Sequence, residues 1–354
     1  MAPDKIHLKN LALEEIPKVL VEHGEQRFRA QQIIKWVYQK RVSSFDQMNN
    51  IPKTARQKLG EIFTIDKLKP VIVRESSDCD AVKFGFRLIE SAHVVECVVL
   101  IDGKRRTACL SSQLGCGLGC AFCETGKLGF IRNLTPEEIV GQLIGINDYL
   151  QEHGDKTVTK IVFMGMGEAL SNFENFRASL ETIRNEDTFN IGGRRITVST
   201  AGIVPSIERL MKEPDLNIGL AISLNAFTNE QRSELMPVNR KYPIEQLVAI
   251  ARRYFEKTGR RVTFEYVVID GKSNTHEAAV QLERYLGEFP CKINLIPVNP
   301  GAGQNFKSPS IETLEKFSDE LHRRGLAATV RKSRGRDISG ACGQLTAHIV
   351  SVQQ

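Results

Sequence analysis

The sequence predicts an α/β fold: a partial, open (β/α)6 barrel that follows a small N-terminal helical domain and a β-hairpin extension. The main observation is that short apolar runs alternate with helical patterns from about residue 105 onward. Such alternation is typical of a parallel sheet with right-handed crossovers. Six or so units are too few to close an eight-stranded barrel. We therefore expect an open barrel, with its site at the carboxyl ends of the strands.

The N-terminal segment has helical periodicity between residues 11 and 63. Phe28, Ile33 and Val37 recur at roughly helical intervals, and Pro52 stands where a further helix would begin. We assign residues 1–68 to a helical accessory domain.

A change to strand-like patterns follows. Residues 82–88 and 94–101 are apolar runs, and Asp102-Gly103 is a turn signal before the next run. These features predict a β-hairpin extension over residues 69–104, directly before the barrel.

The barrel unit is assigned to residues 105–345. We predict strands at 105–110, 159–164, 195–199, 218–223, 261–268 and 292–296, with a weaker seventh pattern at 327–331. Helices are predicted near 135–150, 172–187, 203–213, 243–257, 274–288 and 311–324. Thr135 and Glu138 have the spacing of an N-terminal capping box for the first of these helices.

The composition is typical of a cytoplasmic protein. The 354 residues include no run of 18 apolar residues, and the first residues have no apolar signal core, so we expect no membrane association. Eight cysteines in a chain of this size indicate reduced ligands or redox groups rather than disulfide staples.

Positive charge is concentrated at both ends of the chain. Residues 1–75 contain 14 Lys and Arg against 9 Asp and Glu, and residues 323–354 contain six against Asp337 alone. This distribution favours a polyanionic partner, although solvated helix faces with surplus lysine would give the same count. The candidate phosphate contacts are Arg331, Lys332, Arg334, Arg336, Lys35, Arg41 and Lys53.

Three cysteines, Cys116, Cys120 and Cys123, lie in one glycine-rich stretch with C-x3-C-x2-C spacing. Three soft thiolates on a short loop suit an iron–sulfur cluster with one iron left without a protein ligand. A structural zinc site would need a fourth Cys or His, and the other nearby thiol is Cys109. The spacing therefore favours a [4Fe-4S] cluster.

Polar motifs stand where the predicted strands end. They are the cysteine stretch, Gly165-Met-Gly-Glu168, Ser199-Thr-Ala-Gly202, Ser223-Leu-Asn225 and Pro297-Val-Asn299. Strand ends often carry turn residues, so each motif alone has an ordinary explanation. Together they predict one ligand-binding rim.

The cysteine spacing, with Phe122 before the third cysteine, resembles the radical S-adenosylmethionine (SAM) superfamily. Almost the whole chain resembles one branch of it, the RNA adenine methyltransferases of the RlmN/Cfr group. The resemblance is carried by Cys109-Leu-Ser-Ser-Gln-Leu-Gly-Cys116, Phe163-Met-Gly-Met-Gly-Glu168, Lys292-Ile-Asn-Leu-Ile-Pro-Val-Asn-Pro300 and Arg331-Lys-Ser-Arg-Gly-Arg-Asp-Ile-Ser-Gly-Ala-Cys-Gly-Gln-Leu345.

This resemblance implies a chemistry that needs two further cysteines. Carbon 2 of adenine is electron-poor, so direct methyl transfer from SAM fails there. One SAM would first methylate Cys342, and a second would give a 5′-deoxyadenosyl radical that abstracts hydrogen from that methyl group. The carbon radical would add to the purine, and a disulfide between Cys109 and Cys342 would release the product. Glu96 would accept the proton from adenine.

The resemblance also implies the remaining binding residues and partners. The SAM contacts would be Gly167, Glu168, Ser199, Ser223, Leu224, Asn225 and Asn299. The substrates would be 23S rRNA and tRNA, the latter at the adenosine 3′ to the anticodon. A flavodoxin-type donor would supply electrons, and we expect a monomer.

Two departures leave an alternative open. Asn225 stands where many relatives have His, and Glu168 is followed by alanine, as in the branch that methylates carbon 8. An adenine C8 methyltransferase of the antibiotic-resistance type is therefore the second hypothesis. A third, of another class, is a non-catalytic iron–sulfur protein that binds RNA and senses redox state. Cys79, Cys97 and Cys291 are interpreted as structural.

Overall fold

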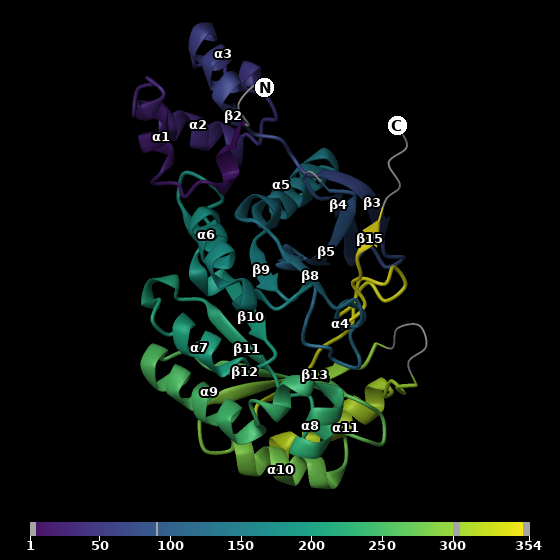
Figure 1. Ribbon diagram of the computed structural model, residues 1–354. Helices are drawn as coiled ribbons and strands as arrows, with labels where there is room; N and C mark the ends of the chain where they lie inside the picture. The colour runs from purple at the N-terminus through teal and green to yellow at the C-terminus, as the bar shows by residue number, and fades with distance from the viewer. Residues whose placement is uncertain (1–4, 90, 300–304, 350–354) are drawn as a thin grey trace.

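The computed structural model describes residues 5–89, 91–299 and 305–349, and its centre is one mixed sheet of 11 strands (Figure 1). Pro300, at the end of one family-like stretch, lies outside the described residues. Seven strands form the parallel part of the sheet. They are β6 (Arg105–Cys109), β9 (Lys160–Phe163), β10 (Ile196–Thr200), β11 (Gly219–Ser223), β12 (Val262–Val268), β13 (Cys291–Pro297) and β14 (Ala328–Val330). The predicted α/β fold is confirmed, and the weak seventh pattern is a short strand.

An antiparallel part continues the same sheet beyond β6. It consists of β3 (Lys69–Glu75), β4 (Ala81–Arg87) and β5 (His93–Asp102), with β5 paired to β6. The last described residues return to this part, where β15 (His348–Ile349) pairs with β5. Strand β5 of the hairpin extension therefore pairs both with the first strand of the barrel and with the last described residues.

Helices cover the outer face of the parallel strands (Figure 1). They are α5 (Pro136–Glu152), α6 (Phe173–Arg184), α7 (Val204–Leu210), α9 (Ile244–Thr258), α10 (His276–Leu286) and α11 (Ile311–Arg323). The short α8 (Asn229–Leu235) lies at the carboxyl ends of β10 and β11, where its Arg232 donates to the carbonyls of Ala201 and Ser223. In α9, Leu247, Ala251 and Tyr254 are buried because their spacing places them on one face of the helix. The capping box of Thr135 and Glu138 is present at the start of α5.

The N-terminal residues form a small helical module against α5 and α6 (Figure 1). It contains β1 (Ile6–His7), the 3-10 turn η1 (Leu8–Asn10), α1 (Ile16–Glu22), α2 (Arg29–Ile34), the π-helical turn η2 (Lys35–Gln39), the 3-10 turn η3 (Phe45–Gln47), α3 (Lys53–Ile62) and β2 (Phe63–Thr64). Arg41 and Lys67 both pair with Asp148 of α5, at 2.7 Å. Among the described residues, no helix is long and apolar enough to cross a membrane.

A buried ion pair joins this module to the barrel. Lys9 and Glu137 are 2% and 1% exposed, and the Lys9 ammonium lies 3.3 Å from the Glu137 carboxylate. Burial lowers the pKa of Lys9 and raises that of Glu137. Each charge therefore depends on the other for compensation.

We expect Lys9→Met to lower the free energy of unfolding by about 3 kcal/mol, because it leaves the buried Glu137 carboxylate without its main counter-charge. Trp36, the one tryptophan of the chain, lies in the module and reports its unfolding in urea by fluorescence. The exposed Lys53→Met is the matched control and should change stability by less than about 0.5 kcal/mol. Equal effects of the two variants would contradict a specific role of the pair.

Candidate active site

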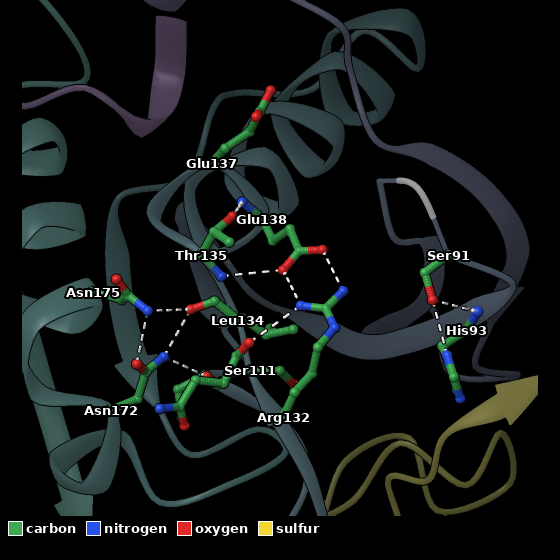
Figure 2. Close-up of polar contacts among 12 residues, drawn as sticks. Ser91, His93, Ser111, Arg132, Leu134, Thr135, Glu137, Glu138, Asn172 and Asn175 are labelled. Atoms are coloured by element: carbon green, nitrogen blue, oxygen red, sulfur yellow. Dashed lines mark hydrogen bonds and ion pairs between the residues drawn. The ribbon is translucent and has the colours of Figure 1, made fainter. Parts of the chain in front are cut away.

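The loop that carries the three cysteines connects β6 to α5. It contains β7 (Gln113–Gly115), α4 (Glu124–Lys127) and β8 (Phe130–Asn133), with β7 and β8 paired. Arg132 holds its far end by two 2.7 Å bonds to the Glu138 carboxylate, as Figure 2 shows. Asn172 and Asn175 both donate to the carbonyl of Leu134 (Figure 2). The loop is therefore fixed at the start of α5 and by the segment after β9.

The three cysteines line one cavity at the carboxyl ends of the strands. Burial raises the pKa of Cys116 to about 11 and that of Cys120 further, and neighbouring thiols contribute in each case. In the described part of the chain, no group of three His, Cys, Asp or Glu side chains is arranged to hold a single metal ion. The fit to an iron–sulfur cluster rests on three thiols that line one void, which the carboxylates of Glu168 and Glu265 also line.

Strand ends form the rest of this cavity, as the sequence predicted for a rim. Gly165, Gly167 and Glu168 follow β9, Ser199 to Ala201 end β10, and Ser223 and Asn225 end β11. Gly167 has φ +93°, and a Cβ there would lie 2.4 Å from Cβ of Gln113, so only glycine fits this approach. The backbone here can come close to a ligand.

Glu168 is the carboxylate of this rim and is 4% exposed. Its Oε2 accepts a 2.8 Å hydrogen bond from the Ala201 amide, while its Oε1 is buried with no hydrogen-bond partner among the described residues. Burial raises the pKa of Glu168 to about 7. A buried carboxylate with a free oxygen fits a cationic ligand group, such as the amino group of SAM.

Three other expected SAM contacts are bonded or buried within the protein. The side chain of Asn225 accepts from the Val267 amide at 2.9 Å and lies 3.2 Å from the sulfur of Met236. Leu224 is fully buried and does not line the cavity. Asn299 donates to the Cys342 carbonyl at 3.3 Å, and its own Oδ1 is buried without a partner among the residues described. Asn299, like Leu224, is not among the residues that line the cavity.

The loop that carries Cys342 is bonded directly to the cysteine loop. The Glu124 amide donates to the Gly343 carbonyl at 2.8 Å, and the Thr125 hydroxyl donates to the Leu345 carbonyl at 2.6 Å. Cys342 lines the same cavity as the three cluster cysteines. Residues more than 200 positions apart thus form one site.

Cys109 and Cys342 line a second cavity that is continuous with the first. Burial raises the pKa of Cys109, and the adjacent Cys342 raises it further. All eight cysteines are free thiols. The disulfide that the resemblance implies between Cys109 and Cys342 during turnover is not present in this structure.

Glu96 lines neither of these two cavities, nor a third cavity at the amino ends of the barrel strands. It is fully buried, its Oε1 lies 3.0 Å from the Lys83 ammonium, and its Oε2 accepts from the Thr346 amide at 3.0 Å. Glu96 thus anchors the segment that follows Cys342. The carboxylate that does line all three cavities is Glu265, which sequence reasoning missed.

Of two buried polar residues that sequence reasoning missed, one had a signal in the sequence and the other had none. Glu265 interrupts the apolar run of β12 on the same face as Thr263 and Val267, a spacing of two that indicates the barrel interior. Arg232 is fully buried, and no sequence pattern marked it because it lies on the short helix α8.

The expected phosphate contacts divide into paired and unpaired cations. Lys35 pairs with Asp187, Arg41 with Asp148, and Arg334 with Asp80 and Asp102. Lys53, Arg331, Lys332 and Arg336 are exposed and form no ion pair within the described residues. Of the seven expected phosphate contacts, these four are therefore without an ion pair in the described part of the chain.

The fold and site define a radical SAM protein. A family model, "Radical SAM superfamily", matches residues 110–282, and another, "Ribosomal RNA large subunit methyltransferase N-terminal domain", matches residues 6–65. Membership in this superfamily implies a [4Fe-4S] cluster and SAM.

Two relatives and one solved structure are similar over nearly the whole chain. "Dual-specificity RNA methyltransferase RlmN" of an Anaeromyxobacter species is 42% identical and covers 96% of this chain and 90% of the relative. The protein of the same name from Desulfotalea psychrophila is 42% identical, over 97% and 95%. The crystal structure of a radical SAM methyltransferase from Sphaerobacter thermophilus has a TM-score of 0.91 at 43% identity, over 96% and 99%. The chain belongs to the RlmN family of dual-specificity RNA methyltransferases.

We expect that changing Cys116, Cys120 and Cys123 together to Ala removes the bound iron and brown colour of anaerobically prepared protein. The reason is that Cys342 would be the one thiol left in the lining of this cavity. Iron and sulfide analysis with the visible absorption spectrum measures this. Cys79→Ala, at an exposed site, is the control and should retain the cluster, as should Cys342→Ala. Four irons per chain in the triple variant would disprove the assignment.

Proposed function

We propose that this protein methylates carbon 2 of adenine in 23S rRNA and in tRNA, at the adenosine 3′ to the anticodon, through a methyl group carried by Cys342. The observation that carries the proposal is a pair of hydrogen bonds to the Cys342 loop, one donated by the Glu124 amide and one by the Thr125 hydroxyl. These bonds hold a free thiol in the cavity of the cluster cysteines and the strand-end rim. A methyl group on that sulfur would lie where hydrogen abstraction must occur.

The residues present fit the two cofactors. Cys116, Cys120 and Cys123 would hold the cluster, and Glu168 with Asn299, both buried with one free oxygen, would bind SAM together with Gly167, Ser199 and Ser223. Bound together, the cluster and SAM would supply a methyl group and a radical, which requires two SAM molecules per turnover. The chain's part is to orient these groups and to exclude water from the cavity.

Cys342 and Cys109 have different surroundings, which supports different roles. Cys342 is exposed to the cavity and lies between Ala341 and Gly343 in a loop, where a sulfur can approach a substrate. Cys109 ends strand β6 and is held rigidly by the sheet. We assign Cys342 as methyl carrier and Cys109 as the second thiol. In turnover the Cys109 sulfur would bond to that of Cys342 as the carbon–sulfur bond to the RNA breaks, and a reductant would afterwards restore both thiols.

The alternatives carry less support. The relatives over the whole chain are named dual-specificity RNA methyltransferases RlmN, which favours carbon 2 over carbon 8. Asn225, the departure that raised the question, has its amide bonded within the protein. A redox sensor without catalysis would not need the rim of Gly167 and Glu168.

The same proposal extends to partners and organisation. A flavodoxin-type donor would reduce the cluster, and the protein would act as a cytoplasmic monomer. We divide the chain into an accessory domain at 1–68, a hairpin extension at 69–104 and the barrel with its C-terminal loop at 105–345.

We expect Cys109→Ala isolated from growing cells to carry RNA covalently attached to Cys342, because no second thiol would be present to open the new carbon–sulfur bond. Cys342→Ala should carry no RNA and no methyl group. Mass spectrometry of the digested protein measures both, with Cys291→Ala as the control thiol. Free Cys342 in the Cys109 variant, with normally methylated RNA, would contradict the two-cysteine mechanism, and the RNA digest would show carbon 2 or carbon 8.

A second pair of variants tests the proton acceptor. Glu96→Gln can still accept the Thr346 bond but cannot take a proton, so we expect it to accumulate the same RNA adduct. Glu265→Gln is the matched change at the carboxyl group that faces the cavity, and we expect it to release methylated RNA. The reverse result would move the base from Glu96 to Glu265.

A further inference from the structure

A third cavity opens at the amino ends of the barrel strands, opposite the cluster. It is lined by Lys160, the first residue of β9, and by Lys292, Thr197 and Thr263, the second residues of β13, β10 and β12. It shares Val162, Met164, Glu265, Arg331 and Lys332 with the cavity of Cys109 and Cys342. The barrel interior is therefore continuous from the amino-end opening to the catalytic thiols.

Four cations of this opening form no salt bridge among the described residues, although the charge of Arg331 lowers the pKa of Glu265 against the effect of burial. Lys160, Lys292, Arg331 and Lys332 form no ion pair within residues 5–89, 91–299 and 305–349. The carboxylates nearby are already engaged. Asp102 pairs with Arg334 at 3.1 Å and Arg105 at 3.8 Å, and Glu265 accepts from Asn294 at 2.9 Å.

These cations lie close enough to affect one another. Burial lowers the pKa of Lys160, and Arg331, Arg105 and Lys292 lower it further. Arg331 also lines the cavity of the two thiols, where its charge lowers the pKa of Cys109 and Cys342 against the effect of burial. Like charges held together around a cavity form a positive field that favours an anion.

The opposite end of the barrel does not offer such a field. The basic residues of the cysteine loop there are neutralised within the protein, with Arg132 bonded to Glu138 and Lys127 to Glu124 at 2.8 Å. That end is also occupied by the cysteine loop itself, including Leu118 and Phe122. A polyanionic strand is attracted to the amino end instead.

We propose that the RNA strand reaches the site through the amino-end opening, where Lys160, Lys292, Arg331 and Lys332 bind the backbone phosphates that flank the target nucleotide. The inference rests on the proposed function, because it takes the substrate to be RNA. The flipped base then passes along the interior to Cys342, while its phosphates stay at the opening. Enzymes that modify a base inside structured nucleic acid take it out of the stack in this manner.

The first test measures the salt dependence of binding to an RNA hairpin of the anticodon stem-loop type, with cluster-loaded protein and SAM. Each phosphate contact contributes about 0.7 to 0.9 to the slope of log K against log salt. We therefore expect Lys160→Gln/Lys292→Gln to reduce the slope by roughly 1.5 and to raise KM for the hairpin. The control is Lys212→Gln/Lys257→Gln, the same charge change at exposed positions on the outer face, which should leave the slope unchanged. An unchanged slope in the first variant would overturn the inference.

The second test uses the unaltered protein and does not depend on the variants folding. 4-Thiouridine is placed beside the target adenosine of the same hairpin, and cross-linked peptides are sequenced after irradiation. We expect cross-links at residues 291–294 and 331–334, and cross-links confined to residues 117–132 would overturn the inference. If the unaltered protein bound the hairpin but did not methylate it, the proposed function would fail. Methylation with cross-links at the cysteine loop would refute only the entry path.

Discussion

The upper rim of the barrel depends on one buried guanidinium, that of Arg232. It donates to the carbonyl oxygens of Ala201, Ser223, Leu224 and Tyr242 and to the side chain of Asn239, at 2.7 to 3.3 Å. Among the residues described it has no carboxylate partner, and burial lowers its pKa to about 10. The planar fork of donors joins the ends of β10 and β11 to the segment before α9. Lysine could not make this set of bonds, because it has three donors on one atom.

The position of the guanidinium also matters for the cysteines. Burial raises the pKa of Cys120, and the charge of Arg232 partly offsets this rise. The same guanidinium therefore bonds to the ends of β10 and β11 and lies close enough to the cysteine loop for its charge to act on Cys120. Replacing Arg232 would therefore affect both the strand ends and the pKa of Cys120.

Much of the fold follows from local patterns in the sequence. The helix starting after Thr135 was predictable because the capping box is a short-range signal, and the barrel strands were predictable because each is a compact apolar run between polar turns. The helical periodicity of Phe28, Ile33 and Val37 gave no sign of an interruption, whereas the structure ends α2 at Ile34 and continues as a π-helical turn. A change in hydrogen-bond register leaves no trace in apolar spacing.

The site was predictable where function requires a short motif and not where it requires long-range packing. The three cysteines, Gly167 and Glu168 are adjacent in sequence to strand ends. By contrast, the ion pair of Glu96 with Lys83 joins two neighbouring strands through their facing side chains, and Lys160 and Lys292 acquire their meaning only when β9 and β13 curve around one interior. Their charges look like ordinary strand-start polarity until the barrel is assembled.

The pairing of β15 with β5 brings the last part of the chain back onto a hairpin made some 250 residues earlier. The Cys342 loop is held between this contact and the bonds to Glu124 and Thr125. During synthesis, the cofactor rim can therefore form before the thiol that must work beside it has been added. A polypeptide that stopped short of the end would keep a place for SAM without a methyl acceptor. The cavity thus combines strand ends of the barrel with a segment that returns to the hairpin, so its walls come from distant parts of the chain.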